Sequence, residues 1–205
     1  MDKRLQQLVK EARILGLPYD VSLPKRLRDI FRTADDQRRH LSLEELQEIC
    51  AFSSIDPKAL LRLQDKADLI VALAKEQLIR EEPSLILSGG ALFPESRAEA
   101  CWRDCWHFLR IAIYAAAADR ATYTSPTGIE AMSKLYKELK VPISSMQRAM
   151  THLRQSAIFI FTDKGNIAHR QTIDRSFDHL EEILKSLVSV QGSGLLISKF
   201  SPAEP

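Results

Sequence analysis

The sequence lacks any long uninterrupted run of apolar residues. None approaches the roughly 18 to 20 residues that span a bilayer, and the opening residues, MDKRLQQLVKEARILG, alternate charged and apolar side chains where a secretion signal would be apolar throughout. We therefore expect no transmembrane segment and a location in the cytosol or an equivalent compartment. An excess of one charge is also missing, because 29 Lys and Arg are interspersed with 27 Asp and Glu, so the charge does not indicate nucleic-acid binding.

Cysteine is rare, and the three that occur, Cys50, Cys101 and Cys105, are odd in number and fit no recurrent zinc spacing. A disulfide framework and a structural metal site are therefore not predicted, and at least one thiol is free for other chemistry. The sequence also lacks a Gly-rich phosphate loop, an H-E-x-x-H helix and a G-x-S-x-G elbow, and its histidines are not paired at metal-ligand spacing. We predict a protein that is not an enzyme.

With only 7 glycines and long runs of Ala, Leu, Lys, Arg and Glu, most of the chain repeats apolar residues at intervals of three and four, which is helical spacing. Only Ile158 to Thr162 has the character of a strand. Helices are expected over about 2–14, 24–36, 42–52, 56–83, 94–119, 126–139, 142–156 and 173–190. Helices with such short connections favour an all-α, globin-like packing, preceded here by an extra helical pair.

One stripe of the long central helix carries a cation, two thiols, a carboxylate and an aromatic ring: Arg97, Cys101, Asp104, Cys105 and Phe108. This set suits a large conjugated acid. A thiol can add to an electrophilic side chain of such a ligand, a carboxylate can accept hydrogen bonds from its pyrrole N–H groups, and an arginine can bind its propionates. Spacing alone leaves a second interpretation open, in which Cys101 is a small buried core residue.

Three neighbouring residues are open to two interpretations each. The indoles of Trp102 and Trp106 either fill a ligand pocket or stack on a ligand, or else belong to the core. Cys105 is either a second attachment point or a structural residue, and the structural role is favoured.

The same helix carries a motif of a known family. Residues 100–104 read Ala-Cys-Trp-Arg-Asp, and matching short motifs stand at family spacing between residues 24 and 190: Ala34-Asp35, His40-Leu41-Ser42, Ile70-Val71-Ala72, Pro83-Ser84-Leu85-Ile86, Gly89-Gly90, Leu109-Arg110, Tyr114-Ala115, Ser144-Ser145 and Ser176-Phe177-Asp178. In these residues the chain resembles the phycobiliproteins, in particular the β-type subunits of phycocyanin and allophycocyanin. The resemblance implies a globin-like domain over residues 24–190, with a helical extension over 1–23 and a tail over 191–205.

Carried over residue by residue, the resemblance implies that Cys101 forms a thioether to phycocyanobilin or a related linear tetrapyrrole. It also implies that Asp104 hydrogen-bonds the central pyrrole N–H groups and that Arg103 and Arg97 bind the propionates. No cysteine occurs between residues 158 and 175, so a second bilin of the phycocyanin β kind is excluded.

Asp35 and Arg110 match residues that pair between subunits in the family. The resemblance therefore implies a homo- or hetero-oligomer with other phycobiliprotein subunits or photosynthetic complex proteins, at the cytoplasmic face of the thylakoid membrane. The function implied is that of a light-absorbing phycobilisome subunit with one bilin. The alternatives are a chromophore-free paralogue that assembles or regulates photosynthetic complexes and a transient bilin carrier or sensor. The helix over 2–14 either covers the protein's own core or is a partner-binding arm.

Overall fold

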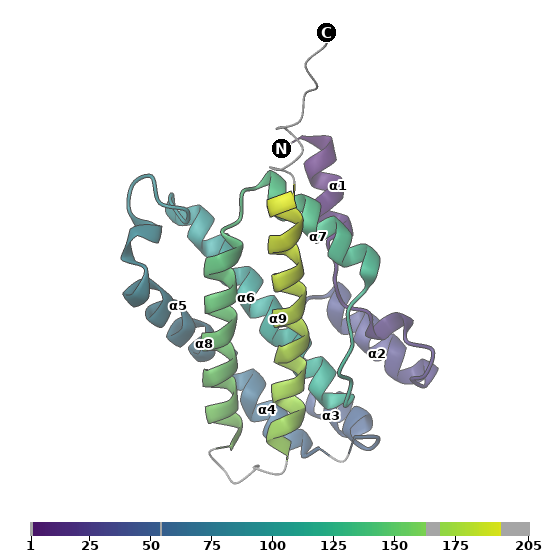
Figure 1. Ribbon diagram of the computed structural model, residues 1–205. Helices are drawn as coiled ribbons and strands as arrows, with labels where there is room; N and C mark the ends of the chain where they lie inside the picture. Colours follow the sequence, from purple (N-terminus) through teal and green to yellow (C-terminus); the bar gives the residue numbers. More distant parts are fainter. Residues whose placement is uncertain (1, 54, 163–168, 194–205) are drawn as a thin grey trace.

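The structure is a computed structural model that describes residues 2–53, 55–162 and 169–193. Within these ranges it contains α-helices, two short 3-10 turns and an isolated bridge between Leu15 and Thr124, so the expected all-α, globin-like class is confirmed (Figure 1). None of the helices in this part of the chain is long and apolar enough to cross a membrane. The elements run in the order α1 Lys3–Glu11, η1 Leu17–Tyr19, α2 Lys25–Asp36, α3 Leu43–Cys50, α4 Pro57–Asp65, α5 Ala67–Glu81, η2 Pro83–Ile86, α6 Glu95–Ala117, α7 Pro126–Glu138, α8 Ile143–Thr162 and α9 Arg170–Ser193.

The centre of the molecule is α6. Every side chain from Phe108 to Ala118 is buried, as expected for a helix segment that other helices surround on all sides. The helices that pack against it include α4, α5, α8 and α9, and the last two run side by side across it (Figure 1). The earlier turns of α6, from Arg97 to Asp104, lie nearer the surface, where part of the helix is open to a ligand.

The N-terminal segment is fastened to the start of α7. Its helix, α1, packs along α7, and the backbone that follows pairs with the loop before α7. The amide of Gly16 donates to the carbonyl of Tyr123 and the amide of Ser125 donates to that of Ile14, both at 2.7 Å. Glycine is required at position 128, because a Cβ there would lie 2.0 Å from the carbonyl oxygen of Arg13.

Two secondary-structure predictions, one of a helix and one of a strand, need correction. The helix expected over 56–83 is divided into α4 and α5 at Lys66, whose backbone leaves the helical region. The strand character of Ile158–Thr162 is overridden, since these residues form the last turns of α8. There Arg154 pairs with Asp174 at 2.7 Å on α9, and the packing of the two helices outweighs the β propensity of the segment. Most of the predicted tail, residues 194–205, lies outside the described residues.

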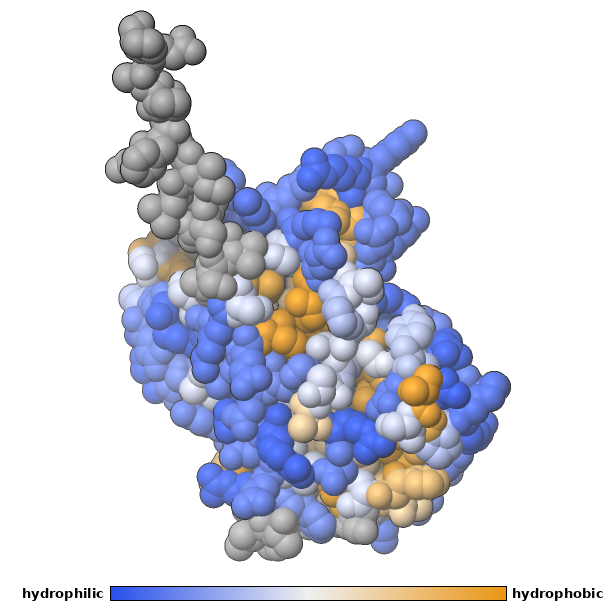
Figure 2. Space-filling model, turned by 45° about the vertical axis from the view of Figure 1, so that its right-hand side comes forward, coloured by the Kyte–Doolittle hydropathy of each residue, from blue (hydrophilic) through white to orange (hydrophobic). Residues whose placement is uncertain are grey.

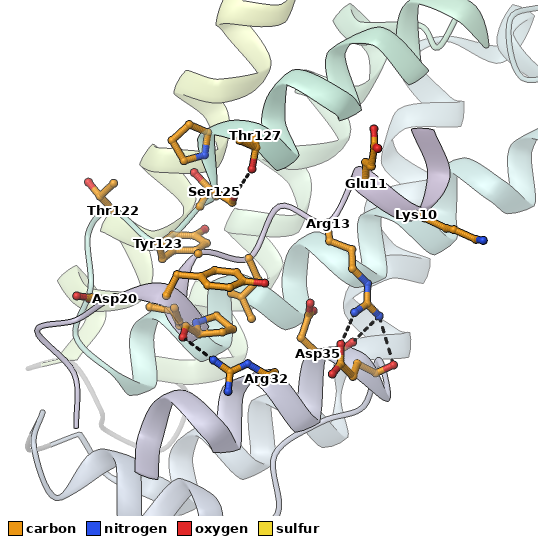
Figure 3. A pocket seen from close by; sticks show the side chains of 18 residues that line it. Lys10, Glu11, Arg13, Asp20, Arg32, Asp35, Thr122, Tyr123, Ser125 and Thr127 are labelled. Carbon is orange, nitrogen blue, oxygen red and sulfur yellow. Dashed lines mark hydrogen bonds and ion pairs between the residues drawn. The ribbon is translucent and has the colours of Figure 1, made fainter. Parts of the chain in front are cut away.

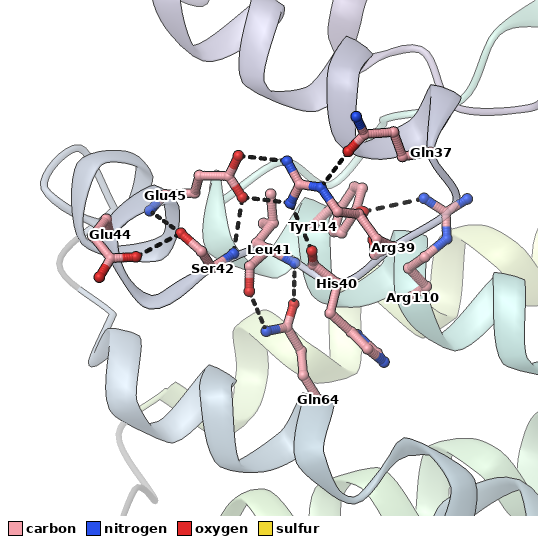
Figure 4. A network of polar contacts seen from close by, with 10 residues as sticks. All are labelled: Gln37, Arg39, His40, Leu41, Ser42, Glu44, Glu45, Gln64, Arg110 and Tyr114. Atoms are coloured by element: carbon pink, nitrogen blue, oxygen red, sulfur yellow. Dashed lines mark hydrogen bonds and ion pairs between the residues drawn. The ribbon is translucent and has the colours of Figure 1, made fainter.

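A buried charge pair holds the end of α2 on α6. The guanidinium of Arg110 lies 2.7 Å from a carboxylate oxygen of Asp35, and the side chains of the two residues are only 5% and 14% exposed. Arg110 also donates to the hydroxyl of Tyr114 at 3.2 Å, and that hydroxyl donates to the carbonyl of Arg39. Arg39 in turn binds both carboxylate oxygens of Glu45, at 2.6 and 2.7 Å, which continues the network into α3 (Figure 4).

We predict that Asp35→Ala lowers the free energy of unfolding by about 3 kcal/mol, because it leaves the buried Arg110 guanidinium without a counter-charge. Chemical denaturation followed by circular dichroism measures this change. Asp29→Ala on the same helix is the control, since Asp29 pairs with Lys25 and Arg32 at an exposed position and its loss should matter little. An equal effect of the two substitutions would contradict the role of the Arg110–Asp35 pair.

Candidate functional site

A cavity of about 500 Å³ lies beside the first half of α6. This volume falls within the range of about 300 to 1,000 Å³ that is usual for small-molecule sites. Four regions of the chain contribute to its wall. The helix α6 contributes Arg97, Cys101, Arg103, Asp104, His107 and Phe108, and Arg38 comes from the residues after α2. The helix α7 contributes Met132, Leu135 and Tyr136, and the N-terminal segment contributes Val9, Ala12, Arg13 and Ile14. On the face seen in Figure 2, apolar surface is exposed between polar side chains instead of forming one continuous patch.

The thiol of Cys101 borders this cavity. The residue is 7% exposed, and burial, followed by the nearby charge of Asp104, raises the pKa of the thiol to about 11. Helical spacing placed Cys101 on the same face as Arg97, Asp104 and Phe108, and all four residues line the cavity. A cysteine therefore lies beside a space large enough for a ligand.

The carboxylate of Asp104 lies one turn further along α6. It accepts a hydrogen bond of 2.8 Å from the hydroxyl of Tyr136 on its Oδ2 atom, and in the described part of the chain no donor reaches its Oδ1 atom. Burial raises the pKa of this carboxyl, and the Tyr136 hydrogen bond and the charges of Arg103 and Arg38 oppose that rise. One carboxylate oxygen thus remains available to a ligand.

The two arginines predicted to bind propionates differ in their surroundings. Arg97 donates to three backbone carbonyls, those of Ala91 at 2.6 Å, of Leu139 at 2.7 Å and of Lys140, and so joins the start of α6 to the end of α7. Arg103, which the helical wheel placed about 200° from Cys101, also lines the cavity and makes no ion pair in the described part of the chain. The propionate roles of both residues stay predictions.

Cys105, Trp102 and Trp106, which the sequence left open to two interpretations, do not line the cavity. Cys105 is 1% exposed, and its sulfur lies 3.7 Å from that of Met146 on α8. Trp102 borders a small void of about 10 Å³ whose wall also includes Cys101 and Cys105. Trp106 contacts the rings of His40 and His107 edge-on, with centroids 4.7 and 5.2 Å away. Neither tryptophan lines the cavity of about 500 Å³.

Three residues of the wall had no chemical role in the sequence interpretation: Arg38, His107 and Tyr136. Tyr136 stands one helical turn after Met132 on α7, and this spacing was a usable signal, whereas Arg38 follows α2 and no helical period points to it. Burial lowers the pKa of His107 to about 4, with a further contribution from Arg110, and its Nδ1 atom has no hydrogen-bond partner among the described residues. No group of three or more His, Cys, Asp and Glu among the described residues could hold a metal ion.

A second cavity, of about 590 Å³, lies on the other side of Arg13 and shares Arg13, Leu15 and Asp35 with the first. Figure 3 shows the guanidinium of Arg13 reaching across to Asp36 and to the backbone at the end of α2. The wall of this second cavity contains no cysteine, and its Arg32 is paired with Asp29 at 2.7 Å. It therefore offers less for covalent chemistry than the cavity beside Cys101.

The fold and the cavity define an all-α protein with a cysteine beside a cavity of ligand size. The model of the family described as phycobilisome protein matches residues 29–184, and the chain belongs to this family. It is 30% identical over 138 residues to the R-phycocyanin beta subunit of Synechococcus sp. (strain WH7803), covering 66% of this chain and 80% of that one. It is also 30% identical over 132 residues to the allophycocyanin alpha chain of Mastigocladus laminosus, covering 63% and 82%. Similar relatives thus include α as well as β subunits, and α1 lies outside the matched region.

We predict that Cys101 reacts with iodoacetamide faster than Cys105 in the folded protein. Cys101 borders the cavity, whereas Cys105 is enclosed and its pKa is raised further by burial. The rate at Cys101 should increase about tenfold per pH unit up to about pH 11, as the thiolate forms. Peptide mass spectrometry of timed samples measures both sites, and the difference should vanish in denaturant. Equal protection of the two cysteines would show that the sulfur at 101 has no access to the cavity.

The depressed pKa of His107 predicts a loss of stability in acid. The unfolded chain takes up the proton near pH 6.5 and the folded one only near pH 4, so stability present above pH 6.5 is lost as the pH falls toward 4. We expect His107→Gln to reduce this loss by about 1–2 kcal/mol, a value discounted for the partial exposure of the ring. Urea titrations at pH 7 and pH 4.5 test this, with His152→Gln as the control, and parallel curves for wild type and His107→Gln would contradict it.

Proposed function

We propose that this protein is a phycobilisome subunit that carries one linear tetrapyrrole, phycocyanobilin or a close relative, through a thioether to Cys101. The observation that carries this proposal is that Cys101 and Asp104 border the same cavity of about 500 Å³. A protein fold alone would not specify the ligand, but membership of the phycobilisome protein family supports this choice. We propose no catalytic activity.

Each part of the cavity wall has a role in this proposal. Cys101 anchors the ligand, and the Oδ1 atom of Asp104 accepts hydrogen bonds from pyrrole N–H groups while Tyr136 orients the same carboxylate. Phe108, Ile111 and the α7 side chains form an apolar wall that restricts twisting of an extended ligand. When bound, the tetrapyrrole supplies the absorption of visible light. A rigid wall favours that use, because a ligand that cannot twist loses less excitation as heat.

The high pKa of the Cys101 thiol indicates that another protein assists attachment of the ligand. A thiol whose pKa is about 11 is almost entirely protonated at neutral pH, and the thiolate is the nucleophile. Attachment without assistance should therefore be slow. We infer that an attaching enzyme, or a base brought by it, takes the proton from Cys101 before the carbon–sulfur bond forms.

The same proposal places the protein with other phycobiliprotein subunits at the cytoplasmic face of the thylakoid membrane. Its support is the family and the names of the relatives, a phycocyanin beta subunit and an allophycocyanin alpha chain among them. Asp35 and Arg110 stay predicted interface residues, although within one chain they already pair with each other at 2.7 Å. Assembly through them would require this pair to be shared with or exchanged for a partner.

A chromophore-free assembly or regulatory protein is the second candidate function. The hydrogen bonds of Arg97 favour it, because they commit this predicted propionate ligand to three backbone carbonyls. The N-terminal segment favours it as well, since Val9, Ala12 and Ile14 contribute to the cavity wall from outside the family match.

Expression together with the enzymes that make phycocyanobilin and attach it separates the two functions. We expect a protein that keeps its visible colour in denaturant and fluoresces on a zinc-stained gel. Cys101→Ala should lose both signals, while Cys105→Ala should keep them and serves as the matched control on the same helix. A colourless wild-type protein would reject the bilin-carrying function and favour the second candidate, and colour lost only in denaturant would show a ligand held without a covalent bond.

A further inference from the structure

Arg38 has a backbone conformation that glycine adopts far more readily than other residues. It follows the last turn of α2 with φ at +51°, and the amide of the next residue, Arg39, donates to the carbonyl of Ala34 at 3.1 Å, which ends the helix. Glycine is the usual residue at this position of a helix end, because a Cβ is crowded there. A strained residue of this kind persists most often where its side chain has a function.

The side chain of Arg38 contributes to the wall of the cavity beside Cys101. In the described part of the chain no carboxylate pairs with it, although most of the other arginines nearby are paired, as Arg13 is with Asp36 and Arg110 with Asp35. Asp104 and His107 line the same cavity, and the positive charge of Arg38 helps to lower the pKa values of both groups.

Arg103 reaches the same part of the wall from α6. Arg103 likewise has no ion pair in the described residues. The charges of Arg110, Arg38 and Arg103 all help to lower the pKa of His107, and of these three only Arg110 is paired with a carboxylate. Two unpaired cations beside an apolar cavity repel each other and attract an anion. Arg97 differs from them, because its Nε and Nη2 groups already donate to the backbone carbonyls of residues 91, 139 and 140.

We propose that Arg38 is a carboxylate-binding residue of this cavity beside Arg103, for which the family resemblance already implies that role, and that Arg97 instead joins α6 to α7. The ligand class is an elongated, mainly apolar molecule with two carboxylates. This inference rests on the proposed function, since a linear tetrapyrrole with its two propionates is such a molecule. Arginine suits the task because its planar guanidinium can bind a carboxylate through two parallel hydrogen bonds.

Binding of biliverdin and of biliverdin dimethyl ester tests the inference, because the ester lacks the two acid groups. The full chain carries Cys101→Ser so that binding stays reversible, and quenching of tryptophan fluorescence gives the dissociation constants. Arg38→Gly removes the cation and places glycine in the backbone conformation that is strained for arginine. Arg38→Asn is the second variant, since asparagine tolerates this conformation and keeps a side chain in the loop. Lys140→Gly is the matched control, because Lys140 also has φ at +51° and a positive charge but does not line the cavity.

We expect the parent protein to bind the acid at least tenfold more tightly than the ester. Both Arg38 variants should weaken binding of the acid about tenfold and leave binding of the ester unchanged, while Lys140→Gly should change neither. The ligand-free Arg38→Gly protein should unfold at the same or a higher temperature than the parent, which excludes a loss of fold as the cause.

Three results would overturn the inference. An unchanged acid affinity in both Arg38 variants, or no preference of the parent for the acid, would reject the role of Arg38 and leave the proposed function standing. An equal weakening by Lys140→Gly would show a general effect of charge instead of a site. Failure of the parent to bind either compound would reject the proposed function and this inference together.

Discussion

The buried pair between Arg110 and Asp35 is the interaction on which the rest of the structure depends. A guanidinium inside an all-helical core is tolerable only with a counter-charge and hydrogen bonds, and this one has both, from Asp35 and Tyr114. Because Asp35 lies in the last turn of α2, the pair determines where that helix ends relative to α6. The position of Arg38 follows from it, and so does one wall of the cavity. The burial of the Arg110 charge and the position of this cavity wall therefore depend on the same contact between α2 and α6.

The sequence was most informative where a regular helix determines the direction of a side chain. Arg97, Cys101, Asp104 and Phe108 were expected on one stripe of α6, and all of them reach the cavity. Cys105 was assigned to the same stripe but contacts α8. Helical geometry gives the angle of a residue around its own axis, whereas the neighbour found at the edge of a stripe depends on how other helices pack.

The remaining features depend on contacts between distant parts of the chain. The hydrogen bonds of Arg97 to the end of α7 join residues about 40 positions apart, and no local sequence pattern predicts them. The direction of the Arg38 side chain could not be predicted from helical spacing, because Arg38 lies just beyond a helix end in a conformation in which glycine would be expected. The break at Lys66 was missed for a related reason, since the apolar repeat continues through it while the backbone does not.

The partnership of α1 with α7 has a consequence for the way the protein is made. The docking surface of α1 lies in residues 126–138, more than a hundred positions later in the chain. Contacts of such long sequence separation form late, because the intervening chain must first be ordered. Until synthesis has passed α7, α1 has no surface to pack against, so the side of the cavity bordered by Val9 and Ile14 stays open although α6 is already complete.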